Sequence, residues 1–169
     1  MKNWTRVGIL LIVGLALLGP HPFLLMRDFH QQAMIGAVPL YWRDQFEVEW
    51  VHSVERTPWR ETYTVDWLRG MELTETTFRA FGAGVPSEVS DATVTVQDGW
   101  IKITALHQRR DSVLYLITRD DYLLRVRHQQ WKLSDVLPLG TSLELSVKWF
   151  PWWYRYLYKL ETRKGVTGR

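Results

Sequence analysis

The chain has 169 residues, ten of them Trp and none of them Cys, and its formal net charge at pH 7 is +3. Its length is that of one compact domain with a short extension. Without Cys the chain forms no disulfide, no zinc–thiolate site and no thiol-dependent active site. At 46% hydrophobic and 23% charged residues, the composition is typical of a folded protein rather than a disordered one.

The charge is unevenly distributed along the chain. Residues 1–27 carry three basic residues and no acidic one, and residues 148–169 carry six basic residues and one acidic residue. Between these ends, residues 28–147 hold 12 basic and 17 acidic side chains. An acidic central part argues against nucleic acid as a partner, because binding to phosphates requires a basic face. Basic ends that flank an acidic domain favour a membrane surface instead.

The first segment is apolar and predicts a membrane anchor. Residues 7–26 read VGILLIVGLALLGPHPFLLM, with no charged side chain, and a helix of about 20 residues spans the hydrocarbon core of a bilayer. A cleaved signal peptide is the alternative, but Leu17 and Pro20 flank the small residue Gly19 and do not make an A-x-A-like cleavage site. We therefore expect a transmembrane helix at about residues 7–26 in an anchor of residues 1–27. Because basic residues precede it, we expect a single-pass protein of the bacterial inner membrane with most of the chain in the periplasm.

Beyond residue 28, two-residue alternation recurs and helical periodicity is weak. The alternation predicts strands, and the strongest local pattern is a pair of strands joined by an Asp98-Gly99 turn. About eight short strands predict an all-β fold, either an antiparallel β-sandwich or a small barrel, in a periplasmic domain of residues 28–147. The expected strands are 46–53, 59–67, 71–79, 93–97, 100–103, 113–118, 122–127 and 142–149, with a further turn at Asp120 and Asp121.

The first two of these strands bring a His and a Glu together. In a hairpin that places Trp50 opposite Tyr63, His52 lies opposite Glu61 on the apolar face, at the loop end. A Glu among aromatic residues is desolvated, and a nearby imidazolium favours its charged form, so the pair is able to share a proton. The alternative is a structural hydrogen bond that fixes the loop of residues 53–60, and structural pairs outnumber catalytic ones.

Motifs of known enzyme classes are absent from the sequence. It contains no G-x-S-x-G, no H-E-x-x-H and no P-loop, and Ser53 points away from His52 because neighbouring residues of a strand face opposite sides. A metal site needs a third ligand, and His107 and His128 lie at no diagnostic spacing. We therefore expect no catalytic residue, no metal and no cofactor.

A second candidate is the loop of residues 81–86, which reads Phe-Gly-Ala-Gly-Val-Pro. Its two glycines suit a backbone with positive φ or a close approach to another group, and the proline stiffens its exit. It is not a dinucleotide fingerprint, because G-x-G-x-x-G must open a helix after a strand. The loop is either a structural connection between strands or a backbone surface for a partner or a small anion.

The tail of residues 148–169 combines aromatic and basic side chains. With Pro151 as the first helical residue, an apolar face lies beside a basic stripe. This predicts a short interfacial helix, since aromatic rings with basic side chains prefer the headgroup region. A helix packed on the sheet is the alternative. The expected membrane-interface residues are Trp149, Trp152, Trp153, Arg155 and Lys159.

The motifs around both candidates resemble those of a known family. His52, Ser53, Val54 and Glu55 with Pro58 and Glu61, followed by residues 81–86, are similar to a small envelope-protein family of unknown function that is encoded beside the membrane subunits of TAXI-type TRAP transporters. The resemblance covers about residues 40–147. It implies association with a tripartite solute transporter, which works with a periplasmic substrate-binding protein, and it carries no catalytic residues.

Together these observations predict a membrane-anchored accessory subunit of a TAXI-type TRAP transporter, which acts by protein–protein interaction and is not an enzyme. The expected partners are the transporter's membrane subunits, the substrate-binding protein and the lipid bilayer. The alternatives are a periplasmic module that binds a small organic anion or a lipid headgroup through His52 and Glu61, and a hydrolase. The expected contact residues are His52, Ser53, Glu55, Glu61, Phe81, Gly82, Ala83, Gly84 and Pro86.

Overall fold

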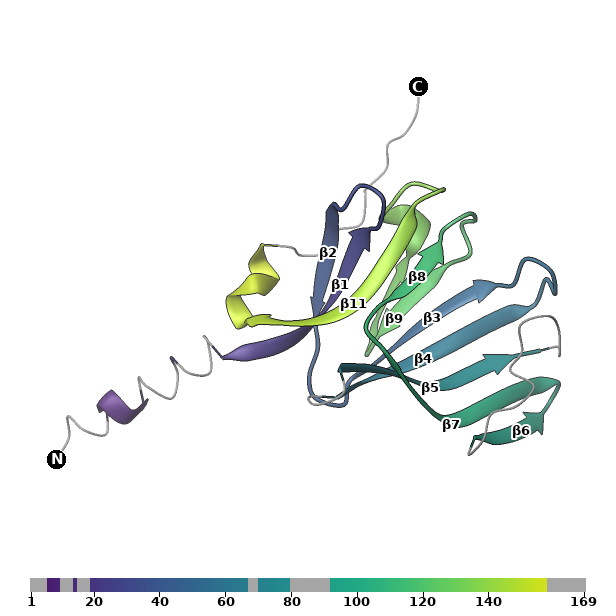
Figure 1. Cartoon of the computed structure of the whole chain (residues 1–169), viewed down its shortest axis with the longest axis horizontal. Helices are drawn as coiled ribbons and strands as arrows, with labels where there is room; N and C mark the ends of the chain where they lie inside the picture. Colours follow the sequence, from purple (N-terminus) through teal and green to yellow (C-terminus); the bar gives the residue numbers. More distant parts are fainter. Residues whose placement is uncertain (1–5, 10–13, 15–18, 67–69, 80–91, 158–169) are drawn as a thin grey trace, which may run out of the picture.

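The computed structural model of the chain is a β-sandwich of two antiparallel sheets (Figure 1). It describes residues 6–9, 14, 19–66, 70–79 and 92–157. The expected all-β fold is confirmed, in the sandwich form. Within the described residues, no helix is long and apolar enough to cross a membrane.

The smaller sheet has four strands in the order β2-β1-β11-β8. Its central pair joins the first and last strands of the fold, which lie antiparallel from the Pro20/Pro151 pair to the Asp28/Leu143 pair. This sheet therefore ties together the two ends of the domain. Its strands are β1 (Pro20–Asp28), β2 (Met34–Pro39), β8 (Val113–Leu116) and β11 (Ser142–Pro151).

The larger sheet has seven strands in the order β10-β9-β3-β4-β5-β7-β6. The β9–β10 hairpin forms one edge and β6 forms the other. Two short 3-10 helices complete the described fold, η1 (Leu133–Asp135) and η2 (Trp152–Tyr156). The strands are β3 (Gln45–Val51), β4 (Pro58–Asp66), β5 (Gly70–Phe78), β6 (Thr93–Gln97), β7 (Trp100–Arg110), β9 (Leu123–Val126) and β10 (Gln129–Lys132).

Strand β1 corrects the expected extent of the anchor. The sequence predicts a helix through residue 26, but Pro20–Asp28 form a strand. Leu24 and Met26 belong to the core between the sheets, whereas Phe23 and Leu25 belong to a second apolar cluster. Because both faces of β1 are buried at residues 23–26, its sequence is continuously apolar there and shows no alternation. The uncharged run that precedes the fold is therefore confined to residues 7–19.

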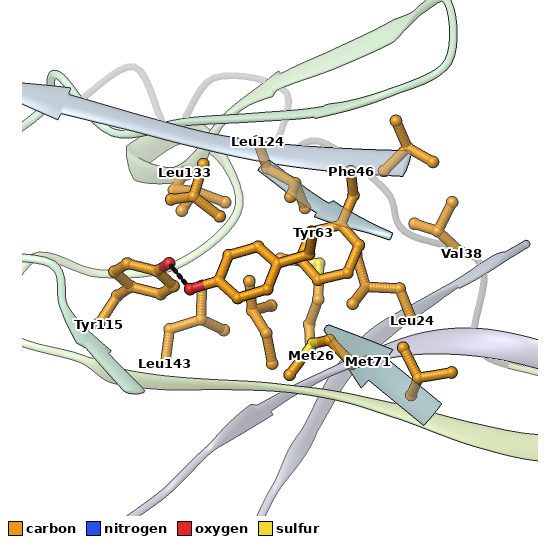
Figure 2. Packing of buried hydrophobic residues seen from close by; sticks show 14 of the residues in the cluster. Leu24, Met26, Val38, Phe46, Tyr63, Met71, Tyr115, Leu124, Leu133 and Leu143 are labelled. Atoms are coloured by element: carbon orange, nitrogen blue, oxygen red, sulfur yellow. Dashed lines mark hydrogen bonds between the residues drawn. The ribbon is translucent and has the colours of Figure 1, made fainter. Parts of the chain in front are cut away.

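The main core lies between the two sheets (Figure 2). Its largest fully buried side chains include Phe46 and Tyr63 of the larger sheet, whose rings are stacked with centroids 4.9 Å apart. Leu24 and Met26 meet them from β1. Burying this apolar surface is the main favourable contribution to folding.

The local patterns of the sequence agree with most strand positions. Asp98 and Gly99 have φ values of 52° and 75°, as the expected two-residue turn between β6 and β7 requires. The turn at Asp120 and Asp121 connects β8 to β9. Besides β1, two strands were not expected, because β2 (MIGAVP) and β10 (QQWK) are short and show no clear alternation.

The outer face of the larger sheet carries a network of four charged residues. Arg125 donates to Glu47 and to Glu49, at 2.5 and 2.8 Å. Arg60 reaches the same two carboxylates, with 2.7 Å to Glu49 and 3.2 Å to Glu47. The network joins β9, β3 and β4 through side chains, in addition to the backbone hydrogen bonds of the sheet.

Candidate functional site

The hairpin of β3 and β4 carries the His and the Glu that the sequence singles out. In it Trp50 lies opposite Trp59, and Phe46 lies opposite Tyr63. The expected register, with Trp50 opposite Tyr63, is therefore wrong by four residues. The observed register stacks both aromatic pairs and leaves a shorter loop, closed by a 2.9 Å hydrogen bond from the His52 N–H to the Thr57 carbonyl. A shorter closed loop costs less conformational entropy.

This register separates His52 from Glu61. Glu61 lies opposite Val48 in the ladder, two residues further into the hairpin than the Trp50/Trp59 pair. The His52 ring instead lies 5.4 Å from the Trp59 ring, and its Nδ1 accepts a 3.4 Å hydrogen bond from the Glu55 N–H. The structure therefore does not bring the expected pair together, and His52 fixes the hairpin loop.

Glu61 lies in a different polar cluster, with Tyr63 of the same strand and Tyr115 of β8. Its Oε2 accepts hydrogen bonds from both phenols, at 2.7 Å from Tyr63 and 2.6 Å from Tyr115. The two phenol oxygens are 2.9 Å apart, and Figure 2 shows their contact in the core. Because β4 and β8 belong to different sheets, this cluster is a polar connection across the sandwich.

The two phenols act as donors. Burial raises the pKa of Tyr63 far above its ordinary value of 10.0, and the nearby charge of Glu61 raises it further. The pKa of Tyr115 is raised for the same two reasons, burial first. Both phenols therefore keep their protons at physiological pH, so neither supplies a phenolate nucleophile or base. The arrangement holds one carboxylate in place and links the sheets.

Sequence reasoning missed Tyr115. Alternation in residues 113–118 predicts that Val113, Tyr115 and Ile117 share one face, and Tyr115 and Ile117 are both in the core. The contact with Glu61 depends on how the two sheets pack together, which the pattern of one strand does not encode.

The remaining expected contact residues have varied positions. Ser53 is exposed at the tip of the β3–β4 hairpin, and Glu55 is half-buried beside it. His107 of β7 faces Glu72, with 3.4 Å between Nδ1 and Oε1. Among the residues that the structure describes, no group of three potential ligands is placed to hold a metal ion. The other expected contact residues, Phe81, Gly82, Ala83, Gly84 and Pro86, lie outside the described residues.

The aromatic tail begins as strand rather than helix. Trp149 belongs to β11, and Pro151 is the last residue of that strand instead of the first of a helix. The five residues of η2 follow, with Trp152, Trp153 and Arg155 among them, and Lys159 lies outside the described residues. The expected short helix is therefore present as a 3-10 helix that begins at Trp152, one residue after the expected start at Pro151.

Tyr154 explains why the tail turns back onto the sheet. Its ring is stacked on Phe150 at 4.0 Å and meets the edge of Phe23 at 5.5 Å. These contacts cover the apolar cluster on the outer face of β1. The alternative of a tail packed on the sheet therefore describes η2 better than an isolated interfacial helix does, although Trp153 remains about half exposed.

The β6 edge is a feature that sequence reasoning did not single out. All five residues of β6 are exposed, with Val94 at 52% and Val96 at 66%. In the ladder, Val94 and Val96 lie opposite Ile103 and Ile101 of β7, two residues of a buried apolar cluster. The two valines therefore extend the apolar inner face of the sheet beyond its last covered strand.

Among the described strands, β6 pairs with β7 on one side and with none on the other. Because a two-residue turn joins β6 to β7, Gln97 and Trp100 form a hydrogen-bonded pair, and such pairs alternate along the ladder. The N–H and C=O groups of Val94 and Val96 therefore point away from β7. Strand β6 has the sequence TVTVQ, without the charge or proline that usually protects an edge.

Comparison with known proteins identifies a family. Residues 46–134, just over half of the chain, match the family model described as domain of unknown function (DUF1850). The matched range begins in β3 and ends in η1, so it includes the β3–β4 hairpin, the polar cluster and the β6 edge. No curated protein and no solved structure matches the chain.

Proposed function

The chain belongs to the DUF1850 family, and we propose that it acts by binding a partner protein at the β6 edge, as a membrane-anchored accessory subunit of a TAXI-type TRAP transporter. The observation that carries the binding function is the exposed, uncharged edge strand. An extended segment of a partner that adds to such an edge gains main-chain hydrogen bonds, while alternate side chains provide specificity.

The side chains of β6 suit this mode of binding. An added strand pairs with the outward-facing backbone groups of Val94 and Val96 and also covers their exposed methyl groups. Burying both valines contributes roughly 25 cal/mol per Å² of apolar surface removed from water. The edge thus offers hydrogen bonds and apolar surface at the same residues.

The choice of partner rests on sequence. The resemblance of the His52–Glu55 and 81–86 motifs implies a TRAP transporter of the TAXI type as the partner, and the uncharged residues 7–19 favour attachment to the membrane in which that transporter lies. The periplasmic side is favoured by the basic residues before this run. The alternative of a ligand site built from His52 and Glu61 has no geometric support, since Glu61 is bonded to two tyrosines instead.

Co-purification of the full chain with the transporter's membrane subunits in a mild detergent tests the proposal. Val96→Pro removes an outward N–H without removing a hydrogen bond of the β6–β7 ladder, and Val96→Lys places a charge on the edge. Leu114→Lys is the matched control, because Leu114 is a similarly exposed aliphatic residue, at 54%, on the edge strand β8 of the other sheet.

We expect the wild-type chain and Leu114→Lys to be recovered with the membrane subunits and both Val96 variants to be lost from them. Circular dichroism of each purified variant verifies that it is folded. Recovery of the wild-type chain only as a free monomer refutes the transporter as partner. Equal recovery of all four proteins refutes the β6 edge as the contact.

A further inference from the structure

A groove of about 600 Å³ lies where the end of β2, the β9–β10 turn and η2 meet. Its volume is within the range of small-molecule sites. Tyr and Trp side chains contribute to its walls, two arginines supply guanidinium groups, and none of the described residues that line it is acidic. The residues that matter for its chemistry are Tyr41, Arg127, Trp131, Trp152, Arg155 and Tyr156.

Arg155 supplies a positive charge that has no carboxylate partner among the residues that the structure describes. Its guanidinium lies 4.7 Å from the Trp152 ring centre and 5.3 Å from that of Tyr156. Contacts with the two rings hold the guanidinium over apolar surface and leave its N–H groups available to an acceptor. The domain of residues 28–147 is acidic overall, with 17 acidic and 12 basic residues. A guanidinium without a described carboxylate partner is therefore unusual beside it.

Arg127, at the β9–β10 turn, supplies a second guanidinium group to the groove. Its guanidinium lies 4.8 Å from the Tyr41 ring centre, donates to the Pro39 carbonyl at 2.6 Å and approaches Asp44 at 3.3 Å. Its backbone has φ of 54°, a conformation that residues other than glycine rarely adopt. Three contacts thus fix the orientation of Arg127 before any ligand arrives.

The groove lies at the end of the sandwich from which the apolar N-terminal run departs. Trp152 directly follows Pro151, which pairs with Pro20 at the start of β1. The Trp152 ring lies 5.2 Å from the ring of His21. Figure 1 shows η2 beside this end of β1. With residues 7–19 in a bilayer, as the proposed anchoring requires, the groove is held near the headgroups, where Trp, Tyr and Arg are favoured.

We propose that this groove binds the anionic headgroup of a membrane phospholipid. The phosphate oxygens accept hydrogen bonds from Arg155 and from the N–H groups of Arg127 that Pro39 and Asp44 leave unused. The glycerol part lies against Trp131 and the apolar residues Ala37 and Val38. A headgroup with a quaternary ammonium is disfavoured, because the two guanidinium groups repel it and already occupy one face of the Tyr41, Trp152 and Tyr156 rings.

Binding of short-chain lipids to the full chain in a nonionic detergent tests this site by calorimetry. The probes are dihexanoyl phosphatidylglycerol, dihexanoyl phosphatidylcholine, glycerol 3-phosphate and inorganic phosphate. The variant is Arg155→Gln, because within the described part of the chain the Arg155 guanidinium contacts the rings of Trp152 and Tyr156 and no carboxylate. The control is Arg109→Gln, which removes the same charge from an exposed residue of β7.

We expect phosphatidylglycerol to bind the wild-type chain and Arg109→Gln equally, and Arg155→Gln to weaken this binding roughly tenfold or more, as the loss of a charge-assisted hydrogen bond requires. Phosphatidylcholine is expected to bind at least tenfold more weakly than phosphatidylglycerol. Equal binding by the two arginine variants overturns the site, and equal binding of the two lipids overturns the charge argument. Binding of glycerol 3-phosphate or inorganic phosphate as tight as that of phosphatidylglycerol overturns the lipid as the ligand.

Because residues 7–19 are proposed to enter the membrane, the site rests in part on that anchoring. The calorimetric test separates the two, since short-chain lipids reach the groove whether or not the chain is anchored. Failure of the β6 edge to bind the transporter leaves this result unchanged.

Discussion

Replacing Glu61 by Leu removes the acceptor of the polar cluster while keeping a side chain of similar size. Two phenols then lose their carboxylate, and they lie in the core with only 2% of Tyr63 and 8% of Tyr115 exposed. Since their oxygens are 2.9 Å apart, one phenol is able to donate to the other, and the second is left without an acceptor. Losing one bond to a charged group is worth about 1.5–3 kcal/mol, and leaving one buried donor unsatisfied costs about 1–3 kcal/mol. Together they give an expected destabilisation of about 2.5–6 kcal/mol before the gain from burying Leu.

Two milder substitutions separate the charge from the acceptor. Glu61→Gln keeps an oxygen that both phenols reach, so it costs only the charge assistance, about 1 kcal/mol. Tyr115→Phe removes one donor and leaves no orphaned group, which predicts a loss of about 1–1.5 kcal/mol. The expected order of destabilisation is therefore Glu61→Leu above Tyr115→Phe, with Glu61→Gln equal to the latter or below it.

Urea unfolding followed by circular dichroism measures these differences, provided that the dependence of the unfolding free energy on urea is unchanged between variants. In the Glu61→Leu background, Tyr115→Phe is expected to cost less than in the wild type, because the phenol it removes has already lost its acceptor. A Glu61→Leu variant within 0.5 kcal/mol of the wild type refutes the cluster as a connection between the sheets. With such a result, Glu61 is again a candidate binding residue rather than a structural one.

Two further predictions concern the β3–β4 hairpin and its neighbours. Burial alone raises the pKa of Glu49, but hydrogen bonds and charges from Arg125 and Arg60 outweigh it and hold the pKa below its ordinary value of 4.5. The ionised Glu49 carboxylate therefore stabilises the fold above pH 4.5, and this stabilisation is lost as the pH falls through the lower pKa of the folded state. Arg125→Met is therefore expected to cost about 1 kcal/mol at pH 7 and less at about pH 3, and equal urea-midpoint shifts at both pH values contradict this. In the Cys-free chain, the double variant Gln45→Cys and Thr64→Cys is expected to form a disulfide on oxidation, because these residues lie opposite each other. If the double variant Glu49→Cys and Thr64→Cys forms the disulfide instead, the register shifted by four residues is the correct one.

Alternation located the strands that have one covered face and one open face. In β3, Phe46 and Val48 are buried while Glu47 and Glu49 face the charge network, and the sequence shows this two-residue period directly. Strand β1 has no such period, because Leu24 and Phe23 are buried on opposite faces. A strand of this kind and the end of a membrane helix have the same composition, so only the tertiary structure separates them.

The candidate site was less predictable than the strands, because it depends on register and on how the sheets pack. Either register places aromatic residues opposite each other on the apolar face, so the pattern alone does not choose between Trp50–Tyr63 and Trp50–Trp59. The contact between Glu61 and Tyr115 joins residues 54 positions apart. Charge and aromatic content did indicate that the tail is unusual, but not that Tyr154 packs on Phe23 while Arg155 turns toward the groove.

The two proposed binding features lie at opposite edges of one sheet. The β9–β10 turn, which lines the groove, belongs to the first edge of the larger sheet, and β6 forms the last. With about 4.8 Å between neighbouring strands, the six intervals across seven strands separate these edges by roughly 29 Å. Figure 1 shows β6 at the end of the molecule away from η2 and the start of β1. If the groove and the N-terminal run hold the domain at the bilayer, β6 lies at the far edge of the larger sheet, where a periplasmic segment of the proposed transporter has room to pair with it.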